Sequence, residues 1–332
     1  MAKRADLILS GGGVKGIGLV GAAVALMDAG YRIQRVSGTS AGSIVGAVIA
    51  AATQHQHMTG ADVKQLALSL DYRKFLDPGP AERVPLLGPA SAVLRGTGIY
   101  RGDYARDWVR SELKNLGVTT FGDLAYDGDR ALPPERRYKL VVTATDLTTS
   151  QMVRLPWDYR RVYGLDPDEQ PVADAVRASM SIPFFFKPVT ITSAAGLTST
   201  LVDGGLVSNF PIDSLDRADG KKPRWPSFGI TVLPTAPRLS TTLKTALDLA
   251  RLGAPPLLLS LIAAALFAHD QTYLNQPWVS SRAIRLDAPE VGIIDFGISK
   301  KATEAFYEKS YAAAQQFLSS WDWEAYLTYW RR

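Results

Sequence analysis

The sequence of 332 residues contains no cysteine, which excludes disulfide bonds, thiolate metal sites and a cysteine nucleophile. It contains only three histidines, so few residues could serve as an imidazole base. It also lacks a long apolar run: residues 255–268 begin with two prolines and are fewer than the roughly 20 residues that span a bilayer. The apolar run after the first basic residues is too short for a signal peptide, so we expect a cytoplasmic protein.

Charge of either sign is not concentrated in any one tract. The formal net charge is +5, from 37 lysine and arginine against 32 aspartate and glutamate residues, which favours contact with anionic surfaces. Because the basic residues are scattered, we do not expect nucleic acid as a partner. Hydrophobic residues at 46% and charged residues at 21% are close to the averages for soluble globular proteins. The chain can therefore bury a large core, in one α/β domain or in two smaller ones.

The order of apolar segments predicts a layered α/β fold. A strand, a glycine turn and a helix are expected over residues 5–31, and the same order repeats over residues 32–53. Further strands are expected at 137–149, 197–205 and 226–234, with a short helix at 171–182. Apolar strands that alternate with helices are typical of a three-layer α/β/α sandwich with a mainly parallel central sheet.

Two regions depart from this alternation. Residues 77–98 contain four prolines and four glycines, which predict a long loop and a candidate lid over a site. From about 239 to 332 the pattern is mainly helical, and residues 300–330 read as one long amphipathic helix.

The apolar segments of this helical part leave two alternatives. One stripe of the last helix carries Trp323, Tyr326, Leu327 and Trp330. Such a stripe packs on the core or, less commonly, lies on a lipid surface. In the same way, residues 255–268 form either a buried core helix or the wall of an acyl pocket.

A glycine turn follows the first predicted strand. Gly11, Gly13 and Gly16 match the pattern G-x-G-x-x-G, but the second strand ends in SGTSAG without the carboxylate that a dinucleotide site needs. The lysine of a P-loop is also absent, so we expect no nucleotide cofactor. The turn is then either a tight connection or an anion cradle at a helix N-terminus, with Lys15 as added positive charge. In an acyl-transfer enzyme the anion would be the oxyanion of the tetrahedral intermediate.

Residues 38–42, Gly-Thr-Ser-Ala-Gly, match G-x-S-x-G between an apolar strand and an apolar helix. This context predicts a nucleophile elbow in which Ser40 sits on a strained turn. Gly38 and Gly42 would leave room for that turn. The alternative is that these small residues only let the helix pack close to the sheet.

A nucleophilic serine needs a base. Neither His55 nor His57 fits, because both follow the elbow helix at the far side of the sheet, and His269 lies on an expected helix away from any strand end. Asp203 is the better candidate, since it ends an apolar strand and is followed by two glycines. We expect this strand to run parallel to its neighbours, so that its end lies beside Ser40. The alternative is a plain Asp-Gly turn.

Three motifs occur together: GGGVKG at 11–16, GTSAG at 38–42 and DGG at 203–205. In this order and context the sequence resembles the patatin-like phospholipase family, and residues 175–189 and 209–211 look like the family too. The resemblance covers most of residues 5–215. It implies a single hydrolase domain over residues 1–332, with neither a metal nor another cofactor.

The resemblance also implies roles for residues. Ser40 would be the nucleophile and Asp203 its base, with oxyanion amides from Gly11, Gly12 and Gly13. The supporting motif positions are Lys15, Gly16, Gly38, Gly42, Gly204 and Gly205. The implied activity is that of a lipid acyl hydrolase (phospholipase A, lysophospholipase or esterase) that touches membranes peripherally. The alternatives are a soluble carboxylesterase or thioesterase, and a phospholipase effector that a ligand or partner activates.

Overall fold

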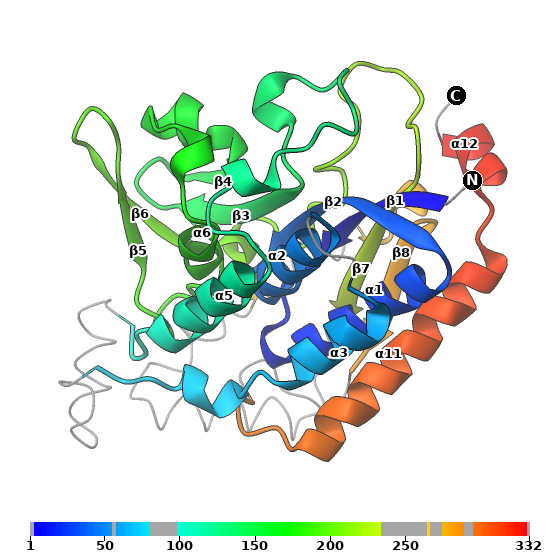
Figure 1. The fold of residues 1–332 in the computed structure, drawn as a ribbon, viewed down its shortest axis with the longest axis horizontal. Helices are drawn as coiled ribbons and strands as arrows, with labels where there is room; N and C mark the ends of the chain where they lie inside the picture. Colours follow the sequence, from blue (N-terminus) through cyan, green and yellow to red (C-terminus); the bar gives the residue numbers. More distant parts are fainter. Residues whose placement is uncertain are drawn as a thin grey trace.

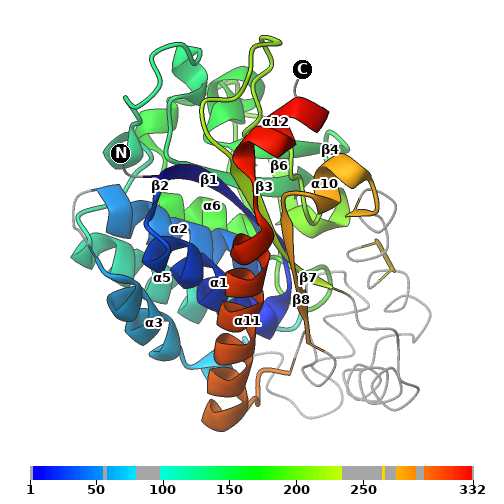
Figure 2. The same cartoon turned by 90° about the vertical axis from the view of Figure 1, so that its right-hand side faces the viewer.

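The computed structural model describes residues 3–54, 58–79, 98–233, 264–265, 274–288 and 295–330. Within them, eight strands form one sheet with helices on both faces (Figures 1 and 2). The predicted α/β sandwich is confirmed.

The sheet is mixed, with a parallel centre. The strand order is β5 (Val189–Thr192), β6 (Thr198–Asp203), β3 (Leu140–Asp146), β2 (Tyr31–Thr39), β1 (Lys3–Leu9), β7 (Ser227–Leu233) and β8 (Ala283–Asp287), and β4 (Gln151–Leu155) pairs with β3. The five strands from β3 to β8 run parallel to one another. Strands β4 and β6 run antiparallel to β3, and β5 runs antiparallel to β6.

Alternate residues of the central strand bury against different layers. Leu7 and Leu9 belong to the large core that includes α1 (Gly16–Asp28), α2 (Ala41–Gln54), α6 (Val172–Ser179) and α11 (Lys300–Ser320). Ile8 points to the opposite face, where it joins a smaller core with Phe210 and with Val279 of α10 (Pro277–Ser280). Successive strand residues face opposite sides, so both faces of β1 must be covered. Helices α3 (Gly60–Leu68) and α5 (Asp103–Asn115) lie outside α1 and α2 in the larger layer (Figure 1).

Helix α11 packs directly on α1 through two glycines. A Cβ at Gly18 would lie 2.6 Å from the ring of Phe306, and one at Gly21 would lie 2.4 Å from the carbonyl oxygen of Tyr307. Only glycine leaves room for this approach. The C-terminal helix is thus part of the sheet's covering layer.

The C-terminal part differs from the prediction in two ways. Strand β8 lies in the region expected to be helical, and the expected helix over 300–330 is divided into α11 and α12 (Trp323–Trp330). The division occurs at Trp321, whose ring turns toward the core and contacts Phe228 with centroids 5.0 Å apart. Burial of this large ring favours the break over continuation of the helix.

The aromatic stripe of α12 packs on the core through Tyr326, which is 5% exposed and lies against Trp321 and Trp323. This favours the core alternative for the stripe, although Trp330 is 40% exposed. Because Trp321 meets Phe228 at the start of β7, α12 lies at the amino end of the parallel strands.

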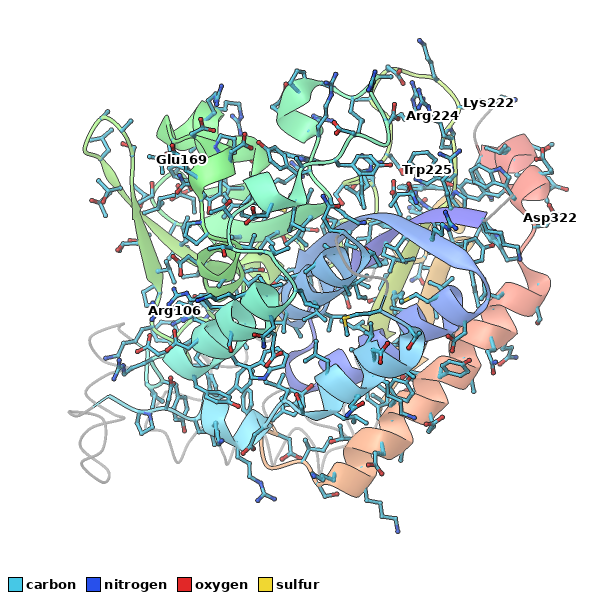
Figure 3. The ribbon with its side chains drawn as sticks, viewed as in Figure 1. Arg106, Glu169, Lys222, Arg224, Trp225 and Asp322 are labelled. Atoms are coloured by element: carbon cyan, nitrogen blue, oxygen red, sulfur yellow. The ribbon has the colours of Figure 1, made fainter. Side chains whose placement is uncertain are left out.

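Several predictions fall on residues outside the described ranges. They include residues 80–97 of the predicted lid loop, all of 255–268 except residues 264 and 265, and the three histidines. Within the described residues, no helix has both the length and the apolar character needed to cross a bilayer. Charged side chains such as Arg106, Glu169 and Lys222 are spread over separate parts of the surface (Figure 3).

Candidate active site

Ser40 occupies a sharp turn between β2 and α2. Its φ angle is +52°, a conformation that costs free energy in a residue with a side chain. A Cβ at Gly38 would lie 2.3 Å from the carbonyl oxygen of Gly42, and one at Gly42 would lie 2.3 Å from that of Leu9. The flanking glycines are therefore required by close backbone contacts, as the elbow motif predicts.

Two other serines hold this strained residue. The amide of Ser40 donates to Oγ of Ser179 at 2.9 Å, and Ser43 donates from both its amide (2.9 Å) and its hydroxyl (2.6 Å) to the carbonyl oxygen of Ser40. Both backbone polar groups of Ser40 are thus satisfied. Its hydroxyl remains available for another interaction.

That hydroxyl donates to Oδ2 of Asp203 at 2.7 Å. Ser40 and Asp203 are 163 residues apart in the sequence, and the strands that pair with β3 bring them together. Thr143 of β3 pairs with Thr39 of β2, and the next residue, Ala144, pairs with Asp203 of β6. Strand β4 occupies the other edge of β3 at both positions. Hence β2 and β6 meet end to end along one edge of β3.

The expectation of a parallel strand for Asp203 is therefore wrong. Strand β6 is antiparallel to β3, and its carboxyl end approaches that of β2 from the opposite direction. The sequence could not distinguish a parallel from an antiparallel β6, because the apolar pattern of a buried strand is the same in both cases. At the junction, a Cβ on Gly204 would lie 2.5 Å from the carbonyl oxygen of Thr143.

Asp203 is 1% exposed, and Ser40 is 4% exposed. Burial raises the pKa of Asp203 to about 7, while hydrogen bonds from Ser40 and from the amide of Gly205 oppose the rise. The Gly205 amide donates to Oδ1 at 2.8 Å, which leaves Oδ2 directed at the serine. A carboxyl group with a pKa near neutrality is suited to accept and return a proton.

The glycine turn at 11–13 lies beside this pair, but its three backbone amides differ in their hydrogen bonding. The amide of Gly11 donates to the carbonyl oxygen of Asn209 at 3.2 Å, and the side-chain amide of Asn209 donates to the carbonyl oxygen of Gly11 at 3.4 Å. The Gly11 amide is thus already used, which corrects its assignment as an oxyanion donor. In the described part of the chain, the amides of Gly12 and Gly13 donate no hydrogen bond and remain the candidates.

Lys15 also differs from the expectation of a charge added to the cradle. Its ammonium group donates to the carbonyl oxygen of Ala288, just beyond β8, at 3.1 Å. Burial lowers the pKa of Lys15 to about 8, and the nearby carboxylate of Asp287 opposes this. Lys15 therefore ties the turn to the end of β8. The next residue, Gly16, permits α1 to approach α2, because its Cβ would lie 3.3 Å from that of Ala41.

Three supporting residues were missed by sequence reasoning: Ser179, Asn209 and Arg177. The guanidinium of Arg177 donates to Oγ of Ser181 at 2.5 Å and to the carbonyl oxygens of Arg101 and Lys187 at 2.5 and 2.7 Å. The amide of Asp203 in turn donates to the carbonyl oxygen of Ser181. The signal was available, since these residues lie in the stretches 175–189 and 209–211, where polar side chains interrupt apolar runs.

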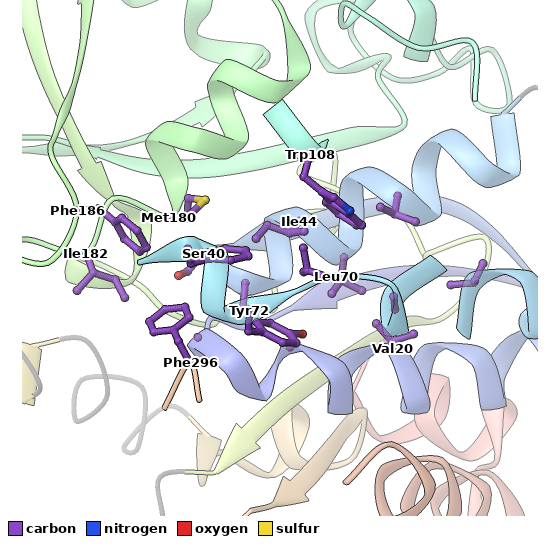
Figure 4. Close-up of a pocket in the computed structure, with 18 residues that line it drawn as sticks. Val20, Ser40, Ile44, Leu70, Tyr72, Trp108, Met180, Ile182, Phe186 and Phe296 are labelled. Carbon is purple, nitrogen blue, oxygen red and sulfur yellow. The ribbon is translucent and has the colours of Figure 1, made fainter. Parts of the chain in front are cut away.

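An apolar cavity of about 60 Å³ adjoins Ser40 (Figure 4). Gly13 and Ser40 line it together with side chains from α1, α2, α3 and α5. A cavity of this size is large enough to hold water, yet apolar walls disfavour water and suit hydrocarbon.

A family model for patatin-like phospholipases matches residues 7–216, which is more than half of the chain. The chain belongs to the patatin-like phospholipase family. This confirms the resemblance stated from the motifs, and the matched range agrees with the predicted range of 5–215.

Relatives of this patatin-like phospholipase span different lengths. It is 34% identical to the protein YqhO of Bacillus subtilis over 317 residues, which cover 95% of the chain and 98% of YqhO. It is 28% identical to the NTE family protein MT2641 of Mycobacterium tuberculosis, of which it spans 46%, with 93% of the chain covered. The fold is also that of VipD from Legionella pneumophila, with a TM-score of 0.53 at 20% identity over 96% of the chain and 67% of VipD.

Proposed function

We propose that this patatin-like phospholipase hydrolyses carboxylic ester bonds of lipids, with Ser40 as the nucleophile and Asp203 as the general base. The hydrogen bond of 2.7 Å between Oγ of Ser40 and Oδ2 of Asp203 carries the proposal. A general base must lie within hydrogen-bond reach of the proton that it removes, and no intervening group is needed here.

In the first step, Oδ2 of Asp203 takes the proton of the Ser40 hydroxyl while Oγ bonds to the ester carbonyl carbon. The carbonyl oxygen becomes an oxyanion, which the amides of Gly12 and Gly13 would stabilise. The carboxyl group of Asp203 then gives this proton to the departing alcohol, and an acyl-serine remains.

In the second step, Asp203 takes a proton from water as the water oxygen bonds to the acyl carbon. The tetrahedral intermediate collapses, the proton returns to Oγ of Ser40, and the fatty acid leaves. A pKa of about 7 supports both directions of this transfer, because neither form of Asp203 is strongly disfavoured near neutral pH.

The test uses Ser40→Ala and Asp203→Asn with the p-nitrophenyl ester of butanoate. We expect each to lower kcat/KM by at least about a thousandfold, since nucleophile and base act as one unit. A fluorophosphonate should label the unchanged protein and fail to label Ser40→Ala. Ser320→Ala, at the exposed end of α11, is the matched control and should keep full activity. Retention of most activity by Asp203→Asn, with loss in His269→Ala, would assign the base to histidine instead.

The apolar cavity favours a lipid over a small soluble ester. Activity should therefore rise when the ester is presented in micelles or phospholipid vesicles, compared with the same ester in solution. Mass spectrometry of the products from a defined phospholipid mixture, with Ser40→Ala alongside, would identify the bond that is cut. Equal activity on dispersed and aggregated substrate would favour a soluble carboxylesterase.

A further inference from the structure

We propose that Arg177 is a positioning residue that holds Asp203 in its place relative to Ser40. It acts through Ser181 and not by contact with the reacting atoms. This inference rests on the acyl hydrolase function proposed above and adds to it a residue on which the rate of the chemical step depends.

The end of α6 contacts the backbone of both proposed catalytic residues. Helix α6 packs against β3 and β6 (Figure 1). Just at its end, Oγ of Ser179 accepts from the amide of Ser40 at 2.9 Å. Two residues later, the carbonyl oxygen of Ser181 accepts from the amide of Asp203 at 2.9 Å. Residues 179–181 therefore connect the two amides and fix how far apart they lie.

Ser181 lies between α6 and β5 and belongs to neither element. Strand β5 begins at Val189 and pairs with β6 only as far as Leu201. Beside Asp203, Ser181 thus occupies the edge of β6 that β5 does not reach. Within the same connection Phe184 has a φ angle of +65°, a costly conformation that persists only where surrounding contacts hold it. The position of Ser181 therefore depends on a group outside this connection.

Arg177 supplies that group at both ends of the connection. Its Nη1 donates to Oγ of Ser181 at 2.5 Å, and its Nη2 donates to the carbonyl oxygen of Lys187 at 2.7 Å. The same Nη2 donates to the carbonyl oxygen of Arg101 at 2.5 Å, just before α5. The hydroxyl of Ser181 in turn donates to the carbonyl oxygen of Arg177 at 2.8 Å. One side chain thus joins α6, the connection and the start of α5.

The guanidinium group is itself held by its surroundings. Arg177 is 5% exposed, and a Cβ at Gly102 would lie 2.5 Å from its Nε. Burial lowers the pKa of Arg177 to about 10, which leaves the group charged near neutral pH. Because the planar group presents its donors in a rigid fork, it fixes acceptors from three segments in one geometry. Loss of the fork would let Ser181 move, and Asp203 with it.

Arg177→Lys tests this role, because it keeps the positive charge but removes the fork. A misplacement of about 1 Å can lower a rate by about a hundredfold. With the p-nitrophenyl ester of butanoate we expect kcat to fall by roughly tenfold to a hundredfold, while KM changes by less than about twofold. The rate of labelling by fluorophosphonate should fall by the same factor, since it also depends on activation of Ser40 by Asp203.

Ser181→Ala breaks the same connection from its other end. It removes the hydroxyl that Arg177 binds and keeps the carbonyl oxygen that accepts from Asp203. We expect kcat to fall roughly tenfold, and this variant decides the matter if Arg177→Lys does not fold. The double variant should lose no more than Arg177→Lys alone, within about twofold, because both changes break one connection.

Arg282→Lys is the matched control for the loss of a buried guanidinium. Arg282 is 1% exposed and donates to both carboxylate oxygens of Asp216, at 2.7 and 2.8 Å. It immediately precedes β8 and so lies at the amino end of the parallel strands, whereas Ser40 follows the carboxyl end of β2. Like Arg177→Lys, this variant should unfold at a lower temperature, but it should keep kcat and the rate of labelling.

Unchanged kcat in folded Arg177→Lys or in folded Ser181→Ala would overturn the inference and leave the hydrolase proposal intact. So would losses that multiply in the double variant, or an equal loss of kcat in Arg282→Lys. If the unchanged protein hydrolyses no ester and fluorophosphonate does not label Ser40, both proposals fall.

Discussion

Asp203→Asn should abolish hydrolysis and also make the protein more stable at alkaline pH than the unchanged protein. Burial raises the pKa of Asp203 from 3.8 to about 7. Between these values the unfolded chain has lost a proton that the folded protein keeps, so the folded state loses stability as the pH rises. This cost is absent below the unfolded-state pKa and complete above the folded-state pKa.

The size of the effect follows from the shift. A difference of about three pKa units corresponds to about 4 kcal/mol in the free energy of unfolding. Roughly 3 kcal/mol of this falls between about pH 5 and about pH 9. Asparagine has no charge to bury. Its carbonyl oxygen can still accept from the Gly205 amide, and its changed contact with the Ser40 hydroxyl involves two neutral groups whose interaction does not depend on pH. The advantage of Asp203→Asn should therefore grow by roughly 3 kcal/mol over this range.

Urea unfolding at about pH 5 and about pH 9, followed by tryptophan fluorescence, would measure this difference in unfolding free energy. Asp107→Asn, on the exposed face of α5, is the control and should follow the unchanged protein. If the difference in unfolding free energy between Asp203→Asn and the unchanged protein stays constant across the range, burial does not destabilise the ionised carboxylate as its surroundings indicate. Its use as a base near neutral pH would then need another explanation.

Three further predictions concern the same site. Because the base must be unprotonated, kcat/KM should rise with pH up to about 7 and level off above it, as a pH profile would show; a profile flat down to about pH 5 would contradict the assigned pKa. Asn209→Ala removes the side-chain donor to the carbonyl oxygen of Gly11. In steady-state kinetics, kcat should fall roughly tenfold or more with KM little changed. An equal loss in a Ser320→Ala control would point to assay error. Gly42→Ala would place a methyl group 2.3 Å from the carbonyl oxygen of Leu9, so we expect little soluble protein, and a normal yield with normal thermal unfolding would refute the packing argument.

The elements near the start of the chain were predictable because they are local. Strands β1 and β2, with the helices after them, are continuous apolar segments separated by glycine turns, and they hold both the turn at 11–13 and Ser40. Strand β8 was not predictable in the same way. This strand, Ala283–Asp287, has only five residues and little alternation of apolar and polar side chains. Its extended conformation depends on pairing with β7.

The different hydrogen bonding of the three glycines in the turn could be found only from the tertiary structure. Gly11, Gly12 and Gly13 are equivalent in the sequence, yet only Gly11 meets Asn209, 198 residues later. Trp108 gave no signal either, because its place in the lining of the cavity depends on how α5 lies beside α1, α2 and α3. Contacts between elements that are distant in the sequence thus give different surroundings to residues that look alike in the sequence.

The meeting of β2 and β6 explains how two side chains could suffice for the chemistry. An aspartate has a short side chain, so it reaches a serine hydroxyl only if their backbones are brought close together. A histidine base reaches further but needs a third residue to orient its ring. Here the edge of β3 places the ends of β2 and β6 at adjacent positions, and the Gly205 amide fixes the unused carboxylate oxygen. The backbone thus supplies the orientation that a third side chain supplies elsewhere, which is why the antiparallel direction of β6 matters to the proposed function.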